Sequence, residues 1–434
     1  MNALLDDLRW RGLIAQSTDI DELGAMLDAG MVTLYCGFDP TAPSLHVGNL
    51  VPLLTLRRFQ QAGHRPIALV GGATGLIGDP SGRTSERTMQ SSAVVEEWVE
   101  LIRAQVTAFL DFEAPGNAAV VVSNLDWTAD VTAIEFLRDV GKHFSVNQML
   151  AKESVSTRLS GEGLSYTEFS YMVLQAFDFH RLYLDHQCRM QIGGSDQWGN
   201  ITAGLDLIRR MNAADDLPPG EAPTAGGLTV PLVTKSDGTK FGKTAGGAIW
   251  LDAERTSPYA FHQFWLNTDD GDIANFVKLF SFAPREEIEQ LLADSAEKPG
   301  LRLAQRFLAD ELTTLVHGQA QALQARAAGQ ALFGTGDLKQ LESATLTAAL
   351  TETGHVSISA ADLASMSLVD LLVESGLCAS KAEARRTITS GGAYVNNDRI
   401  EDLDWSPSTP DMLDGGWVVL RRGKRSVAGV RVVP

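Results

Sequence analysis

The sequence predicts an α/β protein in which a parallel sheet is followed by an α-helical region and a small α+β region. In the first half of the chain, short apolar runs typical of strands alternate with helical patterns, which is the order of βαβ units. The pattern is helical throughout residues 257–332, and two helical stretches precede three short strand-like runs in residues 368–433. We therefore expect a Rossmann-like domain at 1–250, a helical domain at 251–333, a linker at 334–366 and a last domain at 367–434.

The first βαβ unit is the clearest part of this pattern. Val32–Phe38 is an apolar run typical of a strand, Asn49–Gln61 has helical spacing and ends before Gly63, and Ile67–Val70 is the next strand. A right-handed crossover is expected between the two strands. Further strands are expected at Ala119–Ser123, Met190–Ile192 and Leu228–Thr234, and further helices at Ile134–Asp139 and Tyr166–Leu184.

Composition excludes several classes of protein. The 434 residues are 44% hydrophobic and 21% charged, which is typical of a globular protein and not of a disordered one. The longest apolar or small stretch, Pro66–Gly78, is shorter than the ~20 residues of a membrane span. Asp6 and Asp7 stand where a secretory signal would have basic residues. The three cysteines lie far apart and form no metal-binding pair, so we expect a cytoplasmic chain without a metal site.

Charge is distributed unevenly along the chain. The net charge is −18, which disfavours nucleic-acid binding through bulk charge. Residues 366–434, however, hold nine basic and nine acidic side chains, so the excess of acid lies entirely upstream. The basic run Arg421–Arg425 contains no acidic residue, so it is a candidate for local binding of a polyanion.

Two glycine-rich stretches fail to match the familiar phosphate loops. Gly71–Gly78 is spaced as GxxGxxG and not as the GxGxxG of dinucleotide binders. Gly238–Thr244 has three residues between its glycines where a P-loop needs four. A dehydrogenase and a P-loop kinase are therefore disfavoured.

Four clusters do indicate chemistry. His46-Val-Gly48-Asn49 stands at a strand-to-helix turn, where a helix N-terminus favours anions. Tyr171, Gln175 and Asp178 share one face of a helix among apolar neighbours. The remaining two clusters are a Gly-rich turn after a strand, Gln191–Asn200, and a loop with two lysines three residues apart, Lys240–Thr244. Taken singly, each could be an ordinary loop or a solvated polar face.

Together and in this order, the clusters resemble the bacterial tyrosyl-tRNA synthetases, a family of class I aminoacyl-tRNA synthetases, nearly end to end. His46-Val-Gly48-Asn49 is similar to the HIGH signature, with Asn49 in place of its last histidine, and Lys240-Phe-Gly-Lys243-Thr244 is similar to the KMSKS signature. The resemblance implies a tyrosine–tRNA ligase that uses ATP as substrate, with Mg²⁺ on the ATP phosphates.

The resemblance also assigns roles to residues. Tyr35 and Asp178 would hold the phenolic hydroxyl of L-tyrosine. Its ammonium group would be held by Asp39, Tyr171 and Gln175, and Gln197 would lie near its carboxylate. The ATP side would be formed by Gly37, Thr41, His46, Gly48, Asn49, Gly194, Asp196, Lys240 and Lys243. Asp79, Arg83 and Arg87 fall in a segment that the family also uses near its substrates.

The last domain resembles the S4 RNA-binding module. The residues implied to contact tRNA(Tyr) phosphates are Lys381, Arg385, Arg386, Arg421, Arg422, Lys424 and Arg425. The family further implies a homodimer, for which we expect residues 131–151 to supply the contact surface.

Three alternatives remain open at this point. A nucleotidyltransferase with a similar nucleotide site would explain His46 and Lys243, but not Tyr35, Asp178 or the S4-like tail. An RNA-binding protein without synthetase activity would explain only that tail. The tryptophan-specific sister enzyme is closer, although a carboxylate paired with a tyrosine hydroxyl suits a phenol better than an indole.

Overall fold

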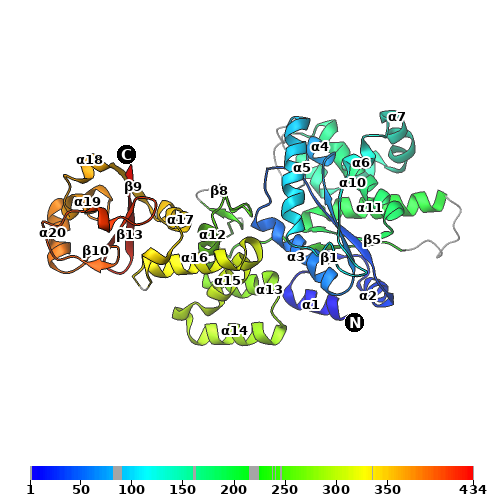
Figure 1. The fold of residues 1–434 in the computed structure, drawn as a ribbon. Helices are drawn as coiled ribbons and strands as arrows, with labels where there is room; N and C mark the ends of the chain where they lie inside the picture. The colour runs from blue at the N-terminus through cyan, green and yellow to red at the C-terminus, as the bar shows by residue number, and fades with distance from the viewer. Residues whose placement is uncertain are drawn as a thin grey trace. The chain divides into compact units, whose positions relative to one another are not determined.

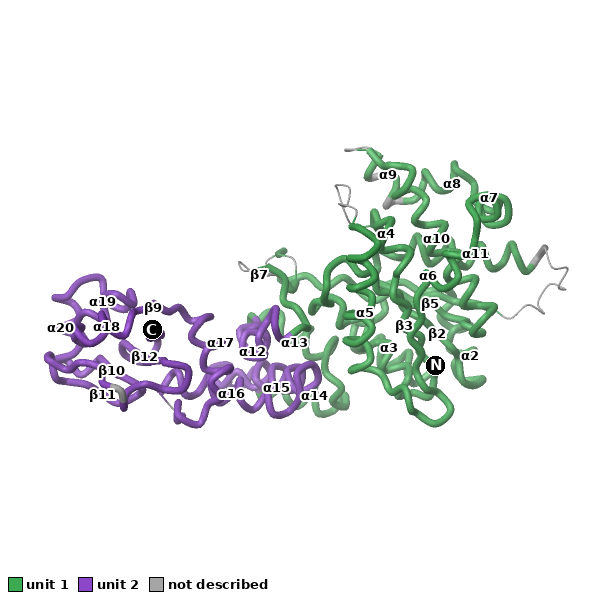
Figure 2. The backbone as a smooth tube through the Cα atoms, turned by 45° about the horizontal axis from the view of Figure 1, so that its top comes forward, with its two compact units in different colours: residues 1–252, 269–294 green, residues 253–268, 295–434 purple. Residues whose placement is uncertain are grey.

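The chain divides into two compact units in a computed structural model that describes residues 2–81, 90–159, 163–214, 224–236, 238–239, 241–244, 247–334 and 336–433. The first unit comprises residues 1–252 and 269–294, and the second comprises residues 253–268 and 295–434 (Figure 2).

A six-stranded sheet forms the centre of the first unit (Figure 1). Its order is β1-β6-β5-β2-β3-β4, and all neighbours are parallel except β1 and β6. Strands β3 and β4 lie on one side of β2, and strands β5 and β6 lie on its other side. The strand order therefore reverses between β2 and β5, the place where open α/β sheets bind ligands. The strands are β1 Gln16–Ser17, β2 Thr33–Phe38, β3 Arg65–Val70, β4 Val120–Ser123, β5 Cys188–Gly194 and β6 Gly226–Val230.

Helices cover this sheet because its strands are apolar on both faces. Phe179 and Leu182 of α10 pack with Tyr35, Ile67 and other strand residues in one core cluster. The helices of this unit are α1 Ala3–Arg11, α2 Ile20–Ala29, α3 Val47–Gln61, α4 Thr74–Ile77, α5 Ser92–Thr107, α6 Leu125–Thr128, α7 Ala133–Glu135, η1 Phe136–Val140, η2 Gly141–His143, α8 Val146–Leu150, α9 Glu153–Leu159, α10 Tyr166–Asp185, η3 Ser195–Gln197, α11 Trp198–Ala214 and α13 Asp270–Phe280. The predicted strands and helices of the βαβ region are confirmed to within a few residues at their ends.

Helix α13 is held to the rest of the first unit at its C-terminal end. The carbonyl oxygen of Ser281 accepts hydrogen bonds from Arg11 Nη1 at 2.8 Å and from Arg58 Nη2 at 2.5 Å. Arg11 Nη2 donates to the carbonyl of Ala283 at 2.9 Å as well. Guanidinium groups thus satisfy carbonyls that a helix end leaves without partners. Helix α14 Arg285–Glu297 follows.

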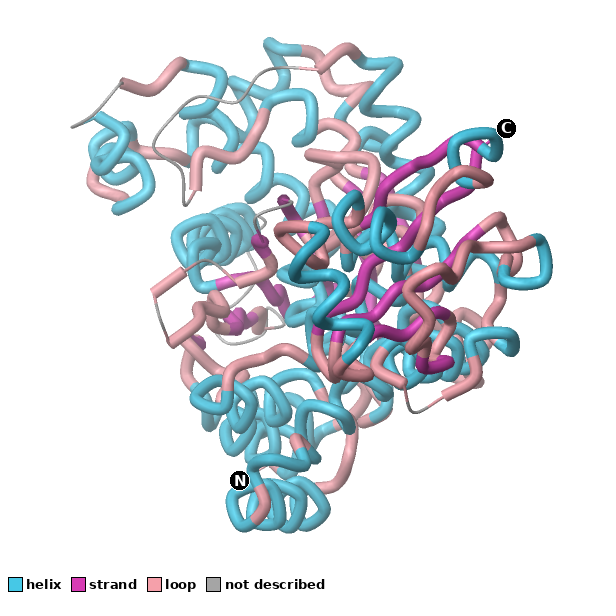
Figure 3. The backbone as a smooth tube through the Cα atoms, turned by 90° about the vertical axis from the view of Figure 1, so that its left-hand side faces the viewer, coloured by secondary structure: helices cyan, strands magenta, loops and turns pink. Residues whose placement is uncertain are grey.

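The second unit contains a helical part and a five-stranded sheet. The helices of the first part are α12 Pro258–Leu266, η4 Pro299–Leu301, α15 Leu303–His317, α16 Gln319–Leu332, η5 Leu338–Gln340 and α17 Ser343–Thr353. The strand order of this sheet is β11-β10-β12-β13-β9. Its last strand, β13, ends beside the C-terminus that is marked in Figure 3. The elements of this part are β9 His355–Ser359, α18 Ala360–Leu363, α19 Leu368–Glu374, α20 Lys381–Thr389, β10 Ala393–Val395, β11 Asp398–Arg399, η6 Thr409–Asp411, β12 Trp417–Arg422 and β13 Ser426–Val433.

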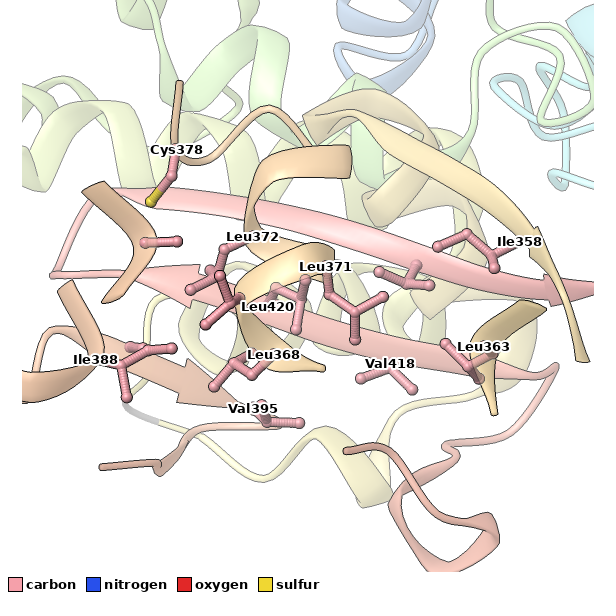
Figure 4. Close-up of a cluster of buried hydrophobic side chains, with 14 residues drawn as sticks. Ile358, Leu363, Leu368, Leu371, Leu372, Cys378, Ile388, Val395, Val418 and Leu420 are labelled. Carbon is pink, nitrogen blue, oxygen red and sulfur yellow. The ribbon is translucent and has the colours of Figure 1, made fainter. Parts of the chain in front are cut away.

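Leucines of α19 form the centre of the core under this sheet. Leu368, Leu371 and Leu372 lie against Val418 and Leu420 of β12 in Figure 4, and all five are fully buried. The predicted helix pair and the three predicted strand segments of this region are confirmed.

The segment expected to be a linker is structured instead. Residues 343–353 form α17, whose Leu346, Ala349 and Leu350 are buried. Residues 355–359 form β9, which pairs in parallel with β13. The Gly and Thr content that indicated a linker is compatible with a helix here because tertiary packing outweighs weak helix propensity.

Candidate active site

The candidate site begins where β2 and β5 end. Asp39 follows directly after β2, and η3 with Asp196 and Gln197 follows directly after β5. Both segments therefore leave the same edge of the sheet, beside the reversal of strand order. The structure brings the tyrosine-side residues predicted from the sequence to this edge.

At the bottom of the site lies a buried phenol beside a buried carboxyl. Tyr35 is 1% exposed, and its Oη has no hydrogen-bond partner within the described residues. Burial, followed by the charge of the nearby Asp178, raises the pKa of Tyr35 well above its ordinary value. An unpaired buried hydroxyl costs about 1–3 kcal/mol, so this group is suited to a ligand that completes its hydrogen bond.

Asp178 is held by two donors, neither of which is Tyr35. Its Oδ2 accepts from Asn124 Nδ2 at 2.9 Å, and its Oδ1 accepts from the Trp127 indole N–H at 2.8 Å. Burial raises the pKa of Asp178 to about 7, although both hydrogen bonds oppose the shift. The carboxyl is thus held in a fixed orientation and near the midpoint of its titration at neutral pH.

Sequence reasoning missed Asn124 and Trp127. Asn124 is fully buried, and its Nδ2 also donates to Thr74 Oγ1 at 2.9 Å while its Oδ1 accepts from the Ala73 N–H at 2.7 Å. Thr74 in turn donates to Asp39 Oδ1 at 2.7 Å. Asn124 follows β4 at the same sheet edge, and that position was the signal that could have identified it.

A second set of side chains at this edge of the sheet is acidic and rich in amides. Tyr171 Oη donates to Asp39 Oδ2 at 2.7 Å, and burial together with that carboxylate raises the pKa of Tyr171 well above its ordinary value. Gln197 Nε2 donates to Asp79 Oδ2 at 2.6 Å. The Tyr171 proton is directed at Asp39, so the lone pairs of its oxygen remain as acceptors for a cationic group.

At the start of α3, the residues that resemble the HIGH signature form a capping box. The Gly48 N–H donates to His46 Nδ1 at 3.1 Å, and Asn49 Oδ1 accepts from the His46 N–H at 3.0 Å. With Nδ1 accepting, the neutral imidazole keeps its proton on Nε2, where it is a donor. A Cβ at Gly48 would lie 2.9 Å from the His46 ring, so this position favours glycine.

The lysine loop lies directly beside this helix N-terminus. The Val47 N–H donates to the Ile249 carbonyl at 3.0 Å, and the Ile249 N–H donates to the Gly242 carbonyl at 2.9 Å. Gly242 has φ 74°, and a Cβ there would come within 2.6 Å of Val47. Two motifs that are nearly 200 residues apart in the sequence are thereby joined through their backbones.

The loop is also held on α13. The Phe241 ring packs on Phe276 and Phe280 at centroid distances of 5.0 and 5.5 Å, and the Ser236 N–H donates to Asp272 Oδ1 at 2.8 Å. Lys243 begins the short strand β7 Lys243–Thr244, which pairs with β8 Gly247–Ala248, and its side chain lies outside the description. Lys240, Arg83 and Arg87 lie outside the described residues altogether.

The remaining nucleotide-side residues lie on the same edge. Thr41 is exposed in the loop after Asp39, and Gly37 is the exposed residue of β2. Gly194 ends β5, and a Cβ there would approach Asp196 Oδ1 to 2.6 Å. Burial, followed by the charge of Asp79, raises the pKa of Asp196.

The basic residues of the last domain separate into two groups. Lys381, Arg385, Arg386, Lys424 and Arg425 are exposed. Arg421, in contrast, is 7% exposed, with its guanidinium 4.0 Å from the Tyr394 ring centroid and its Nη1 bonded to the Gly423 carbonyl. Arg422 forms an ion pair with Glu383 at 2.8 Å and donates to the Leu377 carbonyl. Arg421 and Arg422 are thus bound within the domain, and Lys381 forms an ion pair with Asp370 at 2.7 Å, whereas Arg385, Arg386, Lys424 and Arg425 face water.

The described residues contain no group of three or more histidine, cysteine or acidic side chains placed to hold a metal ion. None of the helices in the part of the chain that the structure describes is long and apolar enough to cross a membrane.

Comparison with known proteins assigns the family. A model of the class I tRNA synthetases (W and Y) matches residues 28–334, and one of the "Tyrosine--tRNA ligase SYY-like C-terminal domain" matches residues 349–428. The chain is 57% identical over 433 residues to the "Tyrosine--tRNA ligase" of Streptomyces coelicolor, covering 100% of this chain and 99% of that one. The chain belongs to the tyrosine–tRNA ligase family. Its counterpart in Mycobacterium tuberculosis is 54% identical over 428 residues, with 98% of both chains covered.

Solved structures agree with this assignment. A C-terminally truncated mitochondrial tyrosyl-tRNA synthetase from Aspergillus nidulans superposes with a TM-score of 0.70 at 30% identity, covering 77% of this chain and 95% of that one. A tryptophanyl-tRNA synthetase from Encephalitozoon cuniculi has a TM-score of 0.52 at 12% identity, covering 79% and 89%, which shows a shared fold alone. The resemblance inferred from the four sequence clusters is confirmed.

Proposed function

We propose that this chain activates L-tyrosine with ATP at the edge of its first sheet and transfers the tyrosyl group to tRNA(Tyr). The observation that carries the proposal is the buried Tyr35 hydroxyl, which has no partner among the described residues and lies within the electrostatic reach of Asp178. A substrate phenol would donate to one of these groups and accept from the other. The proposal places the reaction in the cytoplasm, where tRNA is charged for translation.

Specificity in this scheme comes from the cost of leaving the buried Tyr35 hydroxyl without a partner, since Asp178 already accepts from Asn124 and Trp127. Phenylalanine would offer no hydroxyl to Tyr35 or Asp178. Sites that bond a substrate hydroxyl reject the analogue without it by roughly 10⁴–10⁵, a figure measured for this enzyme class against phenylalanine. The tryptophan-specific alternative fits less well, because an indole N–H cannot accept a hydrogen bond.

The ammonium group of tyrosine would lie beside Asp39 and Tyr171. Tyr171 Oη and Gln175 Oε1 would accept two of its protons, and the carboxylates of Asp39 and Asp79 would balance its charge. Gln197 would lie near the tyrosine carboxylate.

Adenylate formation needs no general base in this site. The tyrosine carboxylate is already ionised when it attacks the α-phosphate of ATP, forming an oxygen–phosphorus bond while pyrophosphate leaves. Catalysis then depends on positioning and on donors matched to the developing charge. His46 Nε2, Thr41 and the lysines 240 and 243 are the proposed donors, with Asn49 Nδ2 and Asp196 toward the ribose. Mg²⁺ would enter with ATP, whose phosphates supply the hard oxygen ligands that it prefers.

Binding of tRNA is assigned to exposed basic residues of the second unit. Arg385 and Arg386 lie on α20 and face water, as do Lys424 and Arg425 in the β12–β13 turn. These residues would contact phosphates in the manner that the S4-like resemblance implies. Arg421 and Arg422 would instead support the fold of this surface.

Dimerisation is proposed through an apolar surface on the first unit. Six large apolar side chains between residues 134 and 166 are exposed, and Ile134 at 72% and Tyr166 at 71% are the most exposed of them. They come from α7, η1, α8, α9 and the start of α10, and Figure 2 labels α7, α8 and α9 at one edge of this unit. A second copy of the chain would cover them, since monomers rarely expose such a concentration of apolar groups. The variant Leu137→Asp should sediment as a monomer while wild type sediments as a dimer.

The decisive experiment is amino-acid-dependent ATP–pyrophosphate exchange without tRNA, run with tyrosine, phenylalanine and tryptophan. Exchange with tyrosine alone is expected. Exchange with tryptophan, or equal exchange with phenylalanine, would refute the assignment of Tyr35 and Asp178 to a phenolic hydroxyl. No exchange with any of the three would favour a different nucleotidyl transfer.

A further inference from the structure

A chain of side-chain amides connects two of the proposed tyrosine-binding residues through a buried asparagine. Asn200 Nδ2 donates to Gln175 Oε1 at 2.9 Å and to Gln197 Oε1 at 3.1 Å. Asn200 is 3% exposed and lies in the first turn of α11, whereas Gln175 is in α10 and Gln197 is in η3. A single NH₂ group thus joins three elements at the edge of the sheet.

The orientation of every amide in this chain follows from Asp79. A carboxylate can only accept hydrogen bonds, and Asp79 accepts from the Ser81 N–H at 2.9 Å and from Gln197 Nε2 at 2.6 Å. Gln197 must therefore turn its oxygen the other way, toward Asn200. Asn200 then presents its NH₂, and the second proton of that group fixes the Gln175 oxygen in the same manner.

We propose that Asn200 is a positioning residue that fixes the orientation of the Gln175 amide, whose oxygen receives the tyrosine ammonium group, and that of the Gln197 amide beside it. This inference rests on the proposed function, because it assumes that Gln175 receives the tyrosine ammonium group. An amide that rotates freely would present NH₂ to that cation for part of the time, and this would repel it. The hydrogen bond from Asn200 excludes the flipped orientation of the Gln175 amide before tyrosine binds. Less side-chain entropy is then lost when tyrosine binds.

Asn200 acts on tyrosine through the glutamines and has no role toward ATP. A purely structural asparagine on this helix would behave differently, and the chain offers one for comparison. Asn212, also on α11, is 8% exposed and donates from Nδ2 to Tyr183 Oη at 3.0 Å. Replacing either side chain by alanine removes a buried amide donor from the same helix, but only Asn200 contacts the glutamines.

The test compares Asn200→Ala, Asn200→Ser and Asn212→Ala by calorimetric tyrosine binding and by ATP–pyrophosphate exchange. For Asn200→Ala we expect the tyrosine Kd and KM to rise about tenfold, the effect of one lost hydrogen bond of ordinary strength, with the ATP KM within about twofold. Asn200→Ser keeps one donor and should show a smaller rise of about threefold. Asn212→Ala should leave both constants near wild type, whatever it does to the melting temperature.

A coupling measurement gives a second criterion. If Asn200 acts through Gln175, the tyrosine penalty of Asn200→Ala should shrink when Gln175 is already replaced by alanine. Equal changes in the tyrosine and ATP constants, or full additivity with Gln175→Ala and with Gln197→Ala, would overturn the inference. If Asn200→Ala fails to fold, Asn200→Ser decides by the same criteria. A wild-type chain that binds no tyrosine would refute the proposed function and this inference together, whereas wild-type binding with unchanged Asn200 variants refutes the inference alone.

Discussion

Replacing Asp178 by asparagine should change how the stability of the chain depends on pH. The pKa of this carboxyl is about 7 in the folded chain and 3.8 ordinarily. Between those values the folded chain holds a proton that the unfolded chain has lost, so the free energy of unfolding falls as pH rises, by about 1.4 kcal/mol per pH unit. Above pH 7 the folded chain bears the whole cost of the buried charge, roughly 4 kcal/mol.

The asparagine variant removes that dependence but introduces a constant penalty. Its oxygen can accept from either Asn124 or Trp127, and its NH₂ then faces the other donor. This conflict costs about 1–3 kcal/mol at any pH. The stability difference between variant and wild type should therefore shift by about 2 kcal/mol in favour of the variant between pH ~5.5 and pH ~8.

Guanidinium unfolding read by tryptophan fluorescence, at both pH values and without tyrosine, measures this shift. Asp126→Asn is the matched control, because Asp126 is exposed on the neighbouring helix α6. Its difference from wild type should be the same at both pH values. A constant difference for Asp178→Asn as well would refute the reasoning, since it would mean that the buried carboxyl does not retain its proton in the folded chain.

Three further predictions concern ATP, tRNA and the lysine loop. His46→Ala should lower the kcat of pyrophosphate exchange by about 10²–10³ with the tyrosine KM unchanged, whereas Asn49→Ala should cost about 1 kcal/mol of stability through the lost cap and raise the ATP KM through the lost ribose contact. The double variant of Arg385 and Arg386 to glutamine should weaken tRNA charging and reduce its salt slope by about two, leaving exchange intact. Phe241→Ala should raise the ATP KM about tenfold by releasing the loop from α13, without affecting calorimetric tyrosine binding in the absence of ATP.

The strands and the large helices were predictable because burial determines the spacing of apolar residues along the sequence. Val32–Phe38 and Ile67–Val70 are apolar on both faces, as strands of a sheet covered by helices must be, and no tertiary information is needed to recognise them. The same holds for α10, whose polar residues 171, 175 and 178 stand out from an apolar face. The segment 334–366 was predicted to be a linker because the composition of α17 does not indicate a helix. Tertiary packing on α17 stabilises that helix.

The candidate site was predictable where a side chain belongs to a motif and unpredictable where it supports one. His46, Asp39 and Asp178 were found from spacing or from resemblance. Asn124 and Asn200 were not, since an isolated asparagine in a sequence gives no sign of the two or three atoms that it will bond. The burial of Arg421 and Arg422 was also not predictable, because it depends on Tyr394 of the neighbouring strand β10 and on Glu383 of helix α20.

The chain passes between its two units at residues 252, 268 and 294, so no single cut separates them. A protein ended at residue 294 would retain α12 but lose α15 and α16, the helices on which α12 packs. Phe261 and Trp265 of α12, both fully buried, would then face water and favour aggregation. A shortened version designed for crystallisation or for display should therefore extend through Leu332, the end of α16, even if only the chemistry of the first sheet is wanted.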